Sequence, residues 1–177
     1  IENYFGILPL ITGSLVVTIG AMLIAFPLGI GTAVYISEIA PRWMREILKP
    51  LVELLGGLPS VVLGFLGILL VSPFLRVFLD LPTGLTAFTG SLLLGGIAVP
   101  TIVSVAEDAL DAVPRAYREG AWALGATRWQ TIWRVTLPAA KSGVLTAVML
   151  GIGRAIGETM TVMMVTGNAP VLAIKLG

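Results

Sequence analysis

The chain has 177 residues, of which 56% are hydrophobic and only 12% are charged, whereas soluble domains usually carry about 25% charged residues. It contains no cysteine and no histidine, which excludes disulfides, thiol nucleophiles, imidazole bases and the usual zinc sites. The formal net charge of +1, with basic residues scattered over several loops, argues against nucleic acid as a partner.

The first residues carry no sign of a natural start. The chain opens on Ile1, and the stretch "IENYFGILPL" lacks the charged beginning of a signal peptide. We therefore expect a fragment of a longer protein, with segments missing at both ends.

Long uncharged runs predict membrane-spanning helices. The runs cover residues 3–37, 54–75, 81–106 and 159–174. Each is near or above the length of about 20 apolar residues that a helix needs to cross a bilayer, and none alternates polar and apolar residues as barrel strands do. We predict an all-α, polytopic membrane protein with one transmembrane domain over residues 1–177. Its spans are expected at about 14–37, 56–79, 85–106 and 139–166.

Glycine and proline recur at the centres or ends of these spans, at Pro27, Gly29, Gly31, Gly56, Gly57, Pro59, Gly95, Gly96 and Pro100. They favour either close packing of helices or bends along a translocation path, where freed backbone groups can meet water. The sequence leaves both interpretations open.

The basic residues predict the orientation of the spans. Most lie in the first and third loops between spans, at Arg42, Arg45, Lys49, Arg115, Arg118, Arg128, Arg134 and Lys141. Arg76 and Lys175 fall on the opposite side. By the positive-inside rule the first and third loops are cytoplasmic. The same loops contain every tryptophan, as expected for rings at the headgroup level: Trp43, Trp122, Trp129 and Trp133.

Residues 107–138 form a long polar stretch whose pattern predicts two short helices. Pro114 suits a helix start, and Gly125 suits a C-terminal cap. Thr127 with Gln130, three residues later, forms a capping box for the second helix, which is expected to end before Pro138. Such a helix pair could simply lie on anionic lipid.

The spacing within this loop favours a different role. Glu119-Gly120-Ala121, three residues, Gly125, nine residues and then Val135-Thr136-Leu137-Pro138 resembles the EAA loop of ABC importer permeases. Gly120 and Val135 stand where that family has alanine and isoleucine. The resemblance implies a type I importer permease (MetI-like) fold with a cytoplasmic coupling helix, which inserts into a groove on a separate ATPase subunit. The coupling loop so implied consists of Glu119, Gly120, Ala121, Gly125, Val135, Leu137 and Pro138.

ATP hydrolysis is expected to come from a partner. No lysine follows a glycine and precedes serine or threonine, so the chain has no Walker motif. Under the resemblance, ATP and Mg bind the partner ATPase, while this chain is a transport permease with no enzyme activity, no cofactor and no metal of its own.

The stretch "GIGRAIGETM" places Arg154 within the last predicted span, 13 residues after Lys141. That distance corresponds to about 20 Å of depth in a core of about 30 Å. Facing lipid there would cost about 2.5–3.5 kcal/mol, so Arg154 is expected to face protein or water. Glu158 follows at i+4 and Thr161 at i+7, nearly on one face of a continuous helix.

Two interpretations of this face remain. Arg154 and Glu158 either neutralise each other and pin two helices, or form an anion relay, since a guanidinium fork suits a tetrahedral oxyanion. We favour a substrate pathway formed by Arg154, Glu158 and Thr161.

The stretch "GRAIGET", together with "GNAP" at residues 167–170 and "EGAWALGATRW", resembles the phosphate ABC importer permease of the PstC type over about residues 14–170. The resemblance implies ATP-driven phosphate import across a bacterial or archaeal plasma membrane by a six-span permease. Its implied partners are a second permease (PstA type), two ATP-binding subunits (PstB type) and an outer phosphate-binding protein (PstS type), within the lipid bilayer. This chain would then lack the first and last spans.

Rival functions stay open. The Arg-Ala-x-Gly-Glu core is also similar to sulfate and molybdate permeases, so the cargo could be another oxyanion. An ion-gradient transporter could use Glu158 as a proton carrier. An intramembrane enzyme has the weakest case, because Glu158 is the only carboxylate firmly inside a predicted span and a two-carboxylate mechanism needs a pair.

Overall fold

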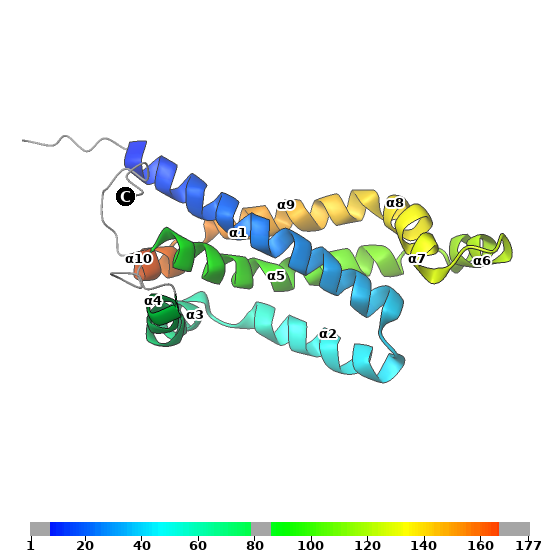
Figure 1. Ribbon diagram of the computed structural model, residues 1–177, viewed down its shortest axis with the longest axis horizontal. Helices are drawn as coiled ribbons and strands as arrows, with labels where there is room; N and C mark the ends of the chain where they lie inside the picture. The colour runs from blue at the N-terminus through cyan, green and yellow to red at the C-terminus, as the bar shows by residue number, and fades with distance from the viewer. Residues whose placement is uncertain (1–7, 79–85, 167–177) are drawn as a thin grey trace, which may run out of the picture. The chain divides into compact units, whose positions relative to one another are not determined.

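The computed structural model describes residues 8–78 and 86–166, which form helices joined by short turns, with no strand among them (Figure 1). The predicted all-α class is confirmed. The motif "GNAP" at residues 167–170 and Lys175 lie outside the described residues. In chain order the elements are α1 (Leu8–Val34), η1 (Tyr35–Ile39), α2 (Arg42–Gly57), α3 (Ser60–Leu66), η2 (Gly67–Val71), α4 (Ser72–Phe78), α5 (Ala87–Asp111), α6 (Arg115–Ala123), α7 (Arg128–Thr131), η3 (Ile132–Thr136), α8 (Leu137–Ala139), α9 (Lys141–Gly157) and α10 (Met160–Thr166).

Within the described part of the chain, three helical stretches are long and apolar enough to cross a bilayer: Ile11–Ile39, Ser60–Phe78 and Ala87–Asp111. A fourth candidate is the pair Arg128–Ala139 and Lys141–Gly157, whose two parts are bent by 73°. The first interspan loop is largely helical, since it contains α2. This helix is amphipathic, with charged residues on one side and apolar residues on the other.

The chain divides into two compact units that share the long helices. Among the described residues, one unit contains 8–25, 58–78, 86–98 and 152–166, and the other contains 26–57 and 99–151. The divisions fall beside Pro27 in α1 and Pro100 in α5, where proline removes a backbone hydrogen bond and weakens the helix. Each unit is described by itself below.

The first unit packs small side chains at its centre. Val17, Ala21, Leu94 and Ala155 form a buried apolar cluster, drawn from α1, α5 and α9. At Gly95 a Cβ atom would lie 3.0 Å from the carbonyl oxygen of Ala21, so glycine allows α5 to approach the backbone of α1. Close packing therefore accounts for this one of the glycines named from the sequence.

The second unit contains α2, α6, α7, η3, α8 and the adjoining parts of α1, α5 and α9. Its largest fully buried side chains include Ile36, Ile102, Val103 and Leu110, which come from the end of α1–η1 and from α5. Helix α6 contains no buried residue. The apolar interior of this unit thus lies along α5. Helix α6 buries no residue in that interior and is attached through the polar contacts described below.

The last predicted span, 139–166, differs from the structure in two places. The chain stays helical through Pro138 and turns only after Ala139. Pro138 follows the π-helical turn η3 and lies in the first positions of α8. A missing backbone N–H is tolerated at the first positions of a helix. Further along, helix α9 ends at Gly157, and α10 begins at Met160. Glu158 and Thr159 therefore interrupt the helix, and Arg154, Glu158 and Thr161 do not share one continuous helical face.

Candidate functional site

The interruption between α9 and α10 is held by the side chain of Glu158. Its Oε1 accepts a hydrogen bond from the backbone N–H of Thr161 at 3.2 Å, one of the amides that a helix start leaves without an intrahelical partner. The hydroxyl of Thr161 lies 3.2 Å from the same Oε1 and 3.0 Å from the carbonyl oxygen of Ser60 at the start of α3. With one proton, this hydroxyl can donate to only one of them at a time.

Thr161 joins two segments that are far apart in sequence. Its side chain is 1% exposed, and α10 packs against α3 (Figure 1). A Cβ atom built at Gly64 of α3 would lie 3.2 Å from the Cα of Thr161. The structure thus brings Glu158 and Thr161 together, as the sequence analysis expected, but through the cap of α10 and not through a shared helix face.

Arg154 lies in the last turn of α9, four residues before Glu158. Its side chain is partly exposed, and its Nε atom is buried. A positive charge near a helix C-terminus interacts favourably with the carbonyl ends of that helix. The positions of Arg154, Glu158 and Thr161 are therefore known, whereas their role as a substrate pathway stays a prediction.

A cavity of about 480 Å³ opens beside the interruption. Its polar lining comes from Ser14, Thr18, Glu158 and Thr159, and the rest is largely apolar. Among the described residues, Arg154 does not line this cavity. Hydroxyl groups and one carboxylate can form hydrogen bonds to a polar solute here, and the apolar remainder would limit the entry of bulk water.

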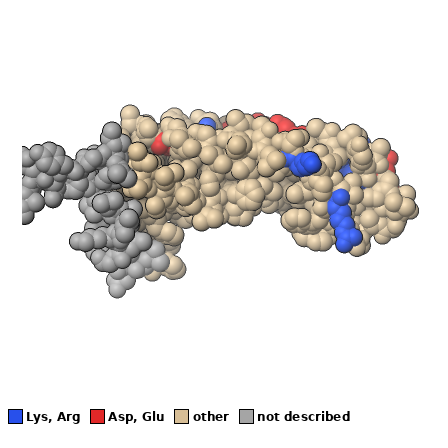
Figure 2. All heavy atoms as spheres, turned by 90° about the horizontal axis from the view of Figure 1, so that it is seen from above, with Lys and Arg blue, Asp and Glu red and all other residues tan. Residues whose placement is uncertain are grey.

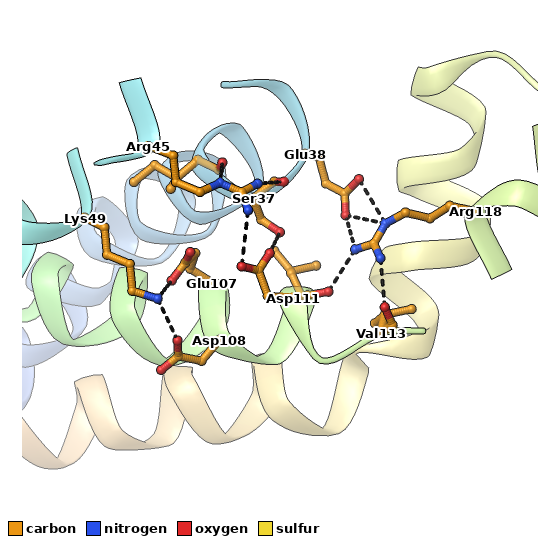
Figure 3. Close-up of polar contacts among 11 residues, drawn as sticks. Ser37, Glu38, Arg45, Lys49, Glu107, Asp108, Asp111, Val113 and Arg118 are labelled. Atoms are coloured by element: carbon orange, nitrogen blue, oxygen red, sulfur yellow. Dashed lines mark hydrogen bonds and ion pairs between the residues drawn. The ribbon is translucent and has the colours of Figure 1, made fainter. Parts of the chain in front are cut away.

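In the second unit, charged side chains form a cluster that the sequence analysis did not identify (Figure 3). We call it the charged cluster; its members are Ser37, Glu38, Arg45, Lys49, Glu107, Asp108, Asp111 and Arg118. The partners are separated by 58 to 80 residues along the chain. They belong to η1, α2, α5 and α6.

Arg45 and Asp111 connect α2 with the end of α5. Nη1 of Arg45 lies 3.3 Å from Oδ2 of Asp111, and Oδ1 of Asp111 accepts a hydrogen bond from Ser37 at 2.6 Å. Arg45 also donates to the backbone carbonyls of Ile36 and Ser37. One guanidinium thus binds both the end of α5 and the backbone of η1.

Lys49 makes the second connection between α2 and α5. Its ammonium donates to Glu107 at 2.6 Å and to Asp108 at 3.0 Å. The hydrogen bond to Glu107 raises the pKa of Lys49 above its ordinary value. The side chain of Glu107 is 2% exposed, so its charge depends on Lys49 for compensation.

Arg118 makes the third connection, from α6 to Glu38 in η1. Its Nε lies 3.0 and 3.3 Å from the two carboxylate oxygens of Glu38, and its Nη2 lies 2.5 Å from Oε1. The same guanidinium donates to the carbonyl oxygens of Val113 at 2.8 Å and Leu110 at 2.9 Å. The side chains of Arg118 and Glu38 are 14% and 8% exposed.

The helix pair predicted for the long loop is confirmed at its starts and at the turn between the helices, but the prediction that the second helix ends before Pro138 is wrong, because the chain stays helical to Ala139. Helix α6 begins after Pro114, Gly125 has a φ of +80°, and Thr127 and Gln130 form both hydrogen bonds of a capping box at the start of α7. Glu119 is exposed on α6. On the face drawn in Figure 2, lysine and arginine side chains gather over the part of the second unit that carries α6, α7 and α8.

Comparison with known proteins identifies the family. Residues 25–176 match the family described as binding-protein-dependent transport system inner membrane component. The chain belongs to this family. As a member of the family, it is a multi-pass membrane protein.

Three curated relatives illustrate the family's range. The chain is 49% identical over 168 residues to the probable ABC transporter permease protein YqgH of Bacillus subtilis, covering 95% of this chain and 54% of that protein. It is 35% identical to the phosphate transport system permease protein PstC of Pasteurella multocida, covering 95% of this chain and 58% of the relative. It is 39% identical to the phosphate transport system permease protein PstC 1 of Mycobacterium tuberculosis, covering 93% of this chain and 54% of the relative. The chain thus spans little more than half the length of these relatives.

A solved structure of the MetNI methionine ABC transporter in inward facing conformations has a similar fold. The TM-score is 0.65 at 24% sequence identity, with 86% of this chain and 68% of that chain covered. The predicted MetI-like fold of a type I ABC importer permease is confirmed.

In this inner membrane component, the sequence identified the charges that lie within long apolar runs, Arg154 and Glu158, and did not identify the charged cluster. Glu107 and Asp108 follow the apolar run of the third predicted span directly, and Glu38 follows the first. The signal that could have indicated the charged cluster was the presence of acidic residues at the ends of two predicted spans, next to loops that carry basic residues and were predicted to lie on the same side of the membrane.

Proposed function

We propose that the chain is the membrane-spanning permease subunit of an ATP-driven importer of inorganic phosphate. The observation that carries the proposal is Arg154 in the last turn of α9, a helix that is otherwise uncharged after Lys141, followed by the interruption at Glu158 and Thr159. Interrupted helices line cavities in transporters because their freed backbone groups need water or a polar solute. Relatives named as phosphate transport system permeases, 33–39% identical over most of this chain, support phosphate as the cargo.

In this proposal Arg154 attracts the anion, since a guanidinium offers a planar fork of donors to a tetrahedral oxyanion. Glu158 and Thr161 shape the path. Glu158 fixes the start of α10 through Thr161, and its negative charge, four residues after Arg154 in the chain, would weaken anion binding enough for release. Thr161 anchors α10 to α3 through Ser60.

The energy source lies outside this chain. We propose that the coupling loop contacts a groove on an ATP-binding subunit (PstB type), which holds ATP and Mg. Exposed Glu119 and Gly120 on α6 support this role, and the confirmed turn at Gly125 presents α6 as a short rigid knob. A second permease (PstA type) and an outer phosphate-binding protein (PstS type) would complete the complex in a bacterial or archaeal plasma membrane.

Transport would follow alternating access. Docking of the loaded binding protein outside and ATP binding inside would close the ATPase dimer, displace the coupling helix and open the path outward, so that phosphate reaches Arg154. Hydrolysis would reverse the change. The isolated permease is expected to hydrolyse no ATP.

The direct test is the ATPase activity of the complete complex, containing this chain at full length with its partners in nanodiscs. Hydrolysis should rise when the phosphate-binding protein is added with phosphate, and should not rise with sulfate or molybdate. Stimulation by sulfate or molybdate with the matching binding protein, and none by phosphate, would replace phosphate with another oxyanion. A chain that co-purifies with no ATP-binding subunit would remove the proposal altogether.

A further inference from the structure

Neighbouring residues on α6 point in different directions. Glu119 is exposed, as a contact for another protein must be. The side chain of Arg118 is 14% exposed and reaches back into its own unit (Figure 3). The coupling helix therefore has one residue free to meet a partner and, beside it, one residue committed to the chain's own helices.

The guanidinium of Arg118 joins three segments. It binds Glu38 in η1, the turn that continues α1, through both carboxylate oxygens. It also binds the carbonyl of Leu110 in the last turn of α5, and that of Val113 between α5 and α6. The carbonyl of Leu110 also accepts a hydrogen bond from the backbone N–H of Val113 at 3.2 Å, and a carbonyl oxygen has two lone pairs, so Arg118 adds a second donor at the end of α5.

Packing holds α6 only weakly. No residue of α6 is buried, and its apolar side chains Tyr117 and Trp122 are 57% and 49% exposed. Apolar burial is the usual force that fixes a helix to its neighbours. Because α6 lacks it, the polar contacts of Arg118 carry the attachment to η1 and α5.

We propose that Arg118 and Glu38 are positioning residues that make α6 move as one body with the ends of α1–η1 and α5. This inference rests on the proposed function, because it assigns a path for the movement that an ATPase subunit would impose on α6. Displacement of α6 would pull η1 through the Arg118–Glu38 pair. Movement of the coupling helix would then be transmitted directly to the end of the first span. It would not have to pass through the longer connection formed by α7, η3, α8 and α9.

The chemistry of the pair suits such a link. A paired, largely buried charge that loses its partner is strongly destabilised, so the two side chains stay together when α6 is displaced. Lysine cannot replace Arg118, because a point charge cannot bind both oxygens of Glu38 and two carbonyls together. Arg45 provides a matched control, since its pair with Asp111 joins α2 to α5 and does not include α6.

The first experiment measures phosphate transported per ATP hydrolysed by the complete complex in proteoliposomes. Arg118→Gln and Glu38→Gln should each lower this ratio about tenfold. The ratio in the double variant should be no lower than in either single variant, because each single variant already breaks the Arg118–Glu38 pair. Arg45→Gln should stay within about twofold of wild type. An unchanged ratio in Arg118→Gln, or losses that multiply in the double variant, would overturn the proposal.

The second experiment measures a distance and needs no transport. Because the sequence contains no cysteine, spin labels can be placed at Tyr117 of α6 and Leu28 of α1, which are 57% and 55% exposed. In the wild-type complex the distance between labels should be the same without nucleotide and with bound ATP. In Arg118→Gln it should shift with nucleotide beyond the width of the wild-type distribution.

The outcomes separate the two proposals. A wild-type distance that changes with ATP would overturn the link even if phosphate is the cargo, and so would a distance that stays constant in both wild type and Arg118→Gln. A complex whose ATPase ignores phosphate would defeat the phosphate assignment, and the label distances would still report on the link. If Arg118→Gln does not assemble, Arg118→Lys, which keeps the charge, should show the same shift with nucleotide.

Discussion

Arg154 is the only charged residue between Lys141 and Gly157 in α9. Its charge would be costly against lipid and useful beside an anion, so a substitution that removes only the charge separates these roles. Glutamine retains hydrogen-bond donors on a side chain of similar reach. The residue-scale predictions concern this charge and the hydroxyl of Thr161.

Arg154→Gln should abolish phosphate uptake while the complex still assembles. The variant keeps polar contacts but loses the electrostatic attraction for an anion. Uptake of radiolabelled phosphate is measured in cells that lack every other phosphate transporter, and assembly by co-purification with the ATPase subunit. Arg76→Gln is the control, since Arg76 is an exposed arginine in the last turn of α4, and it should transport normally. Uptake at the wild-type level in Arg154→Gln would defeat the role given to its charge.

Thr161→Val should weaken the complex and slow uptake. It removes the hydroxyl that lies within reach of Ser60 and Glu158 and leaves a partly buried acceptor without that donor, at a cost of about 1 kcal/mol. Thr166→Val is the matched control in the same helix, because that hydroxyl donates to the carbonyl of Val162 within α10. The thermal midpoint of the purified complex should fall more for Thr161→Val. Equal losses for both variants would contradict the anchoring role.

Sequence alone revealed Arg154 and Glu158 because a charge inside an apolar run is conspicuous. It did not reveal the interruption between α9 and α10, since no proline marks it and glycine is tolerated within membrane helices. The side chain of Glu158 caps the start of α10 by accepting from Thr161 N–H, and the carbonyl of Ser60, 101 residues away, lies within hydrogen-bond distance of the Thr161 hydroxyl. The contact with Ser60 does not follow from local pattern.

At the scale of elements, the helix pair α6 and α7 was predictable because every signal for it is local. Pro114 starts one helix, Gly125 ends it, and the capping box starts the next. The charged cluster was not predictable from local pattern, because Glu38 and Arg118 lie 80 residues apart and nothing local pairs them. The coupling loop thus has a fold set by sequence-local chemistry and an attachment set by tertiary structure.

Glycine at two positions of this loop should respond oppositely to alanine. At Gly125 the φ of +80° makes alanine cost about 1–2 kcal/mol, so hydrogen exchange of the α6 and α7 amides should quicken. At Gly120, inside α6, a Cβ atom meets nothing within 4 Å, and alanine should stabilise the helix by about 1 kcal/mol and slow exchange. Changes in the same direction for both variants would contradict the assigned turn.

At the scale of the whole molecule, the chain is a multi-pass member of the binding-protein-dependent transport system inner membrane components, and its described residues form two compact units. The apolar runs predicted the spans at Ile11–Ile39, Ser60–Phe78 and Ala87–Asp111 closely, because hydropathy is what a bilayer selects. The bend of 73° before α9 was not visible, since helix direction depends on tertiary packing. The central claim of the proposed function is that the cargo is phosphate and that ATP hydrolysis on a partner subunit drives its transport.

Uptake of radiolabelled phosphate into proteoliposomes tests that claim most directly. The vesicles contain the complete complex, with ATP supplied to the ATPase side and the phosphate-binding protein on the opposite side. The account predicts phosphate accumulation with ATP and none with a pH gradient in ATP-free vesicles. Accumulation driven by the pH gradient alone, without ATP, would contradict it and identify an ion-gradient transporter instead.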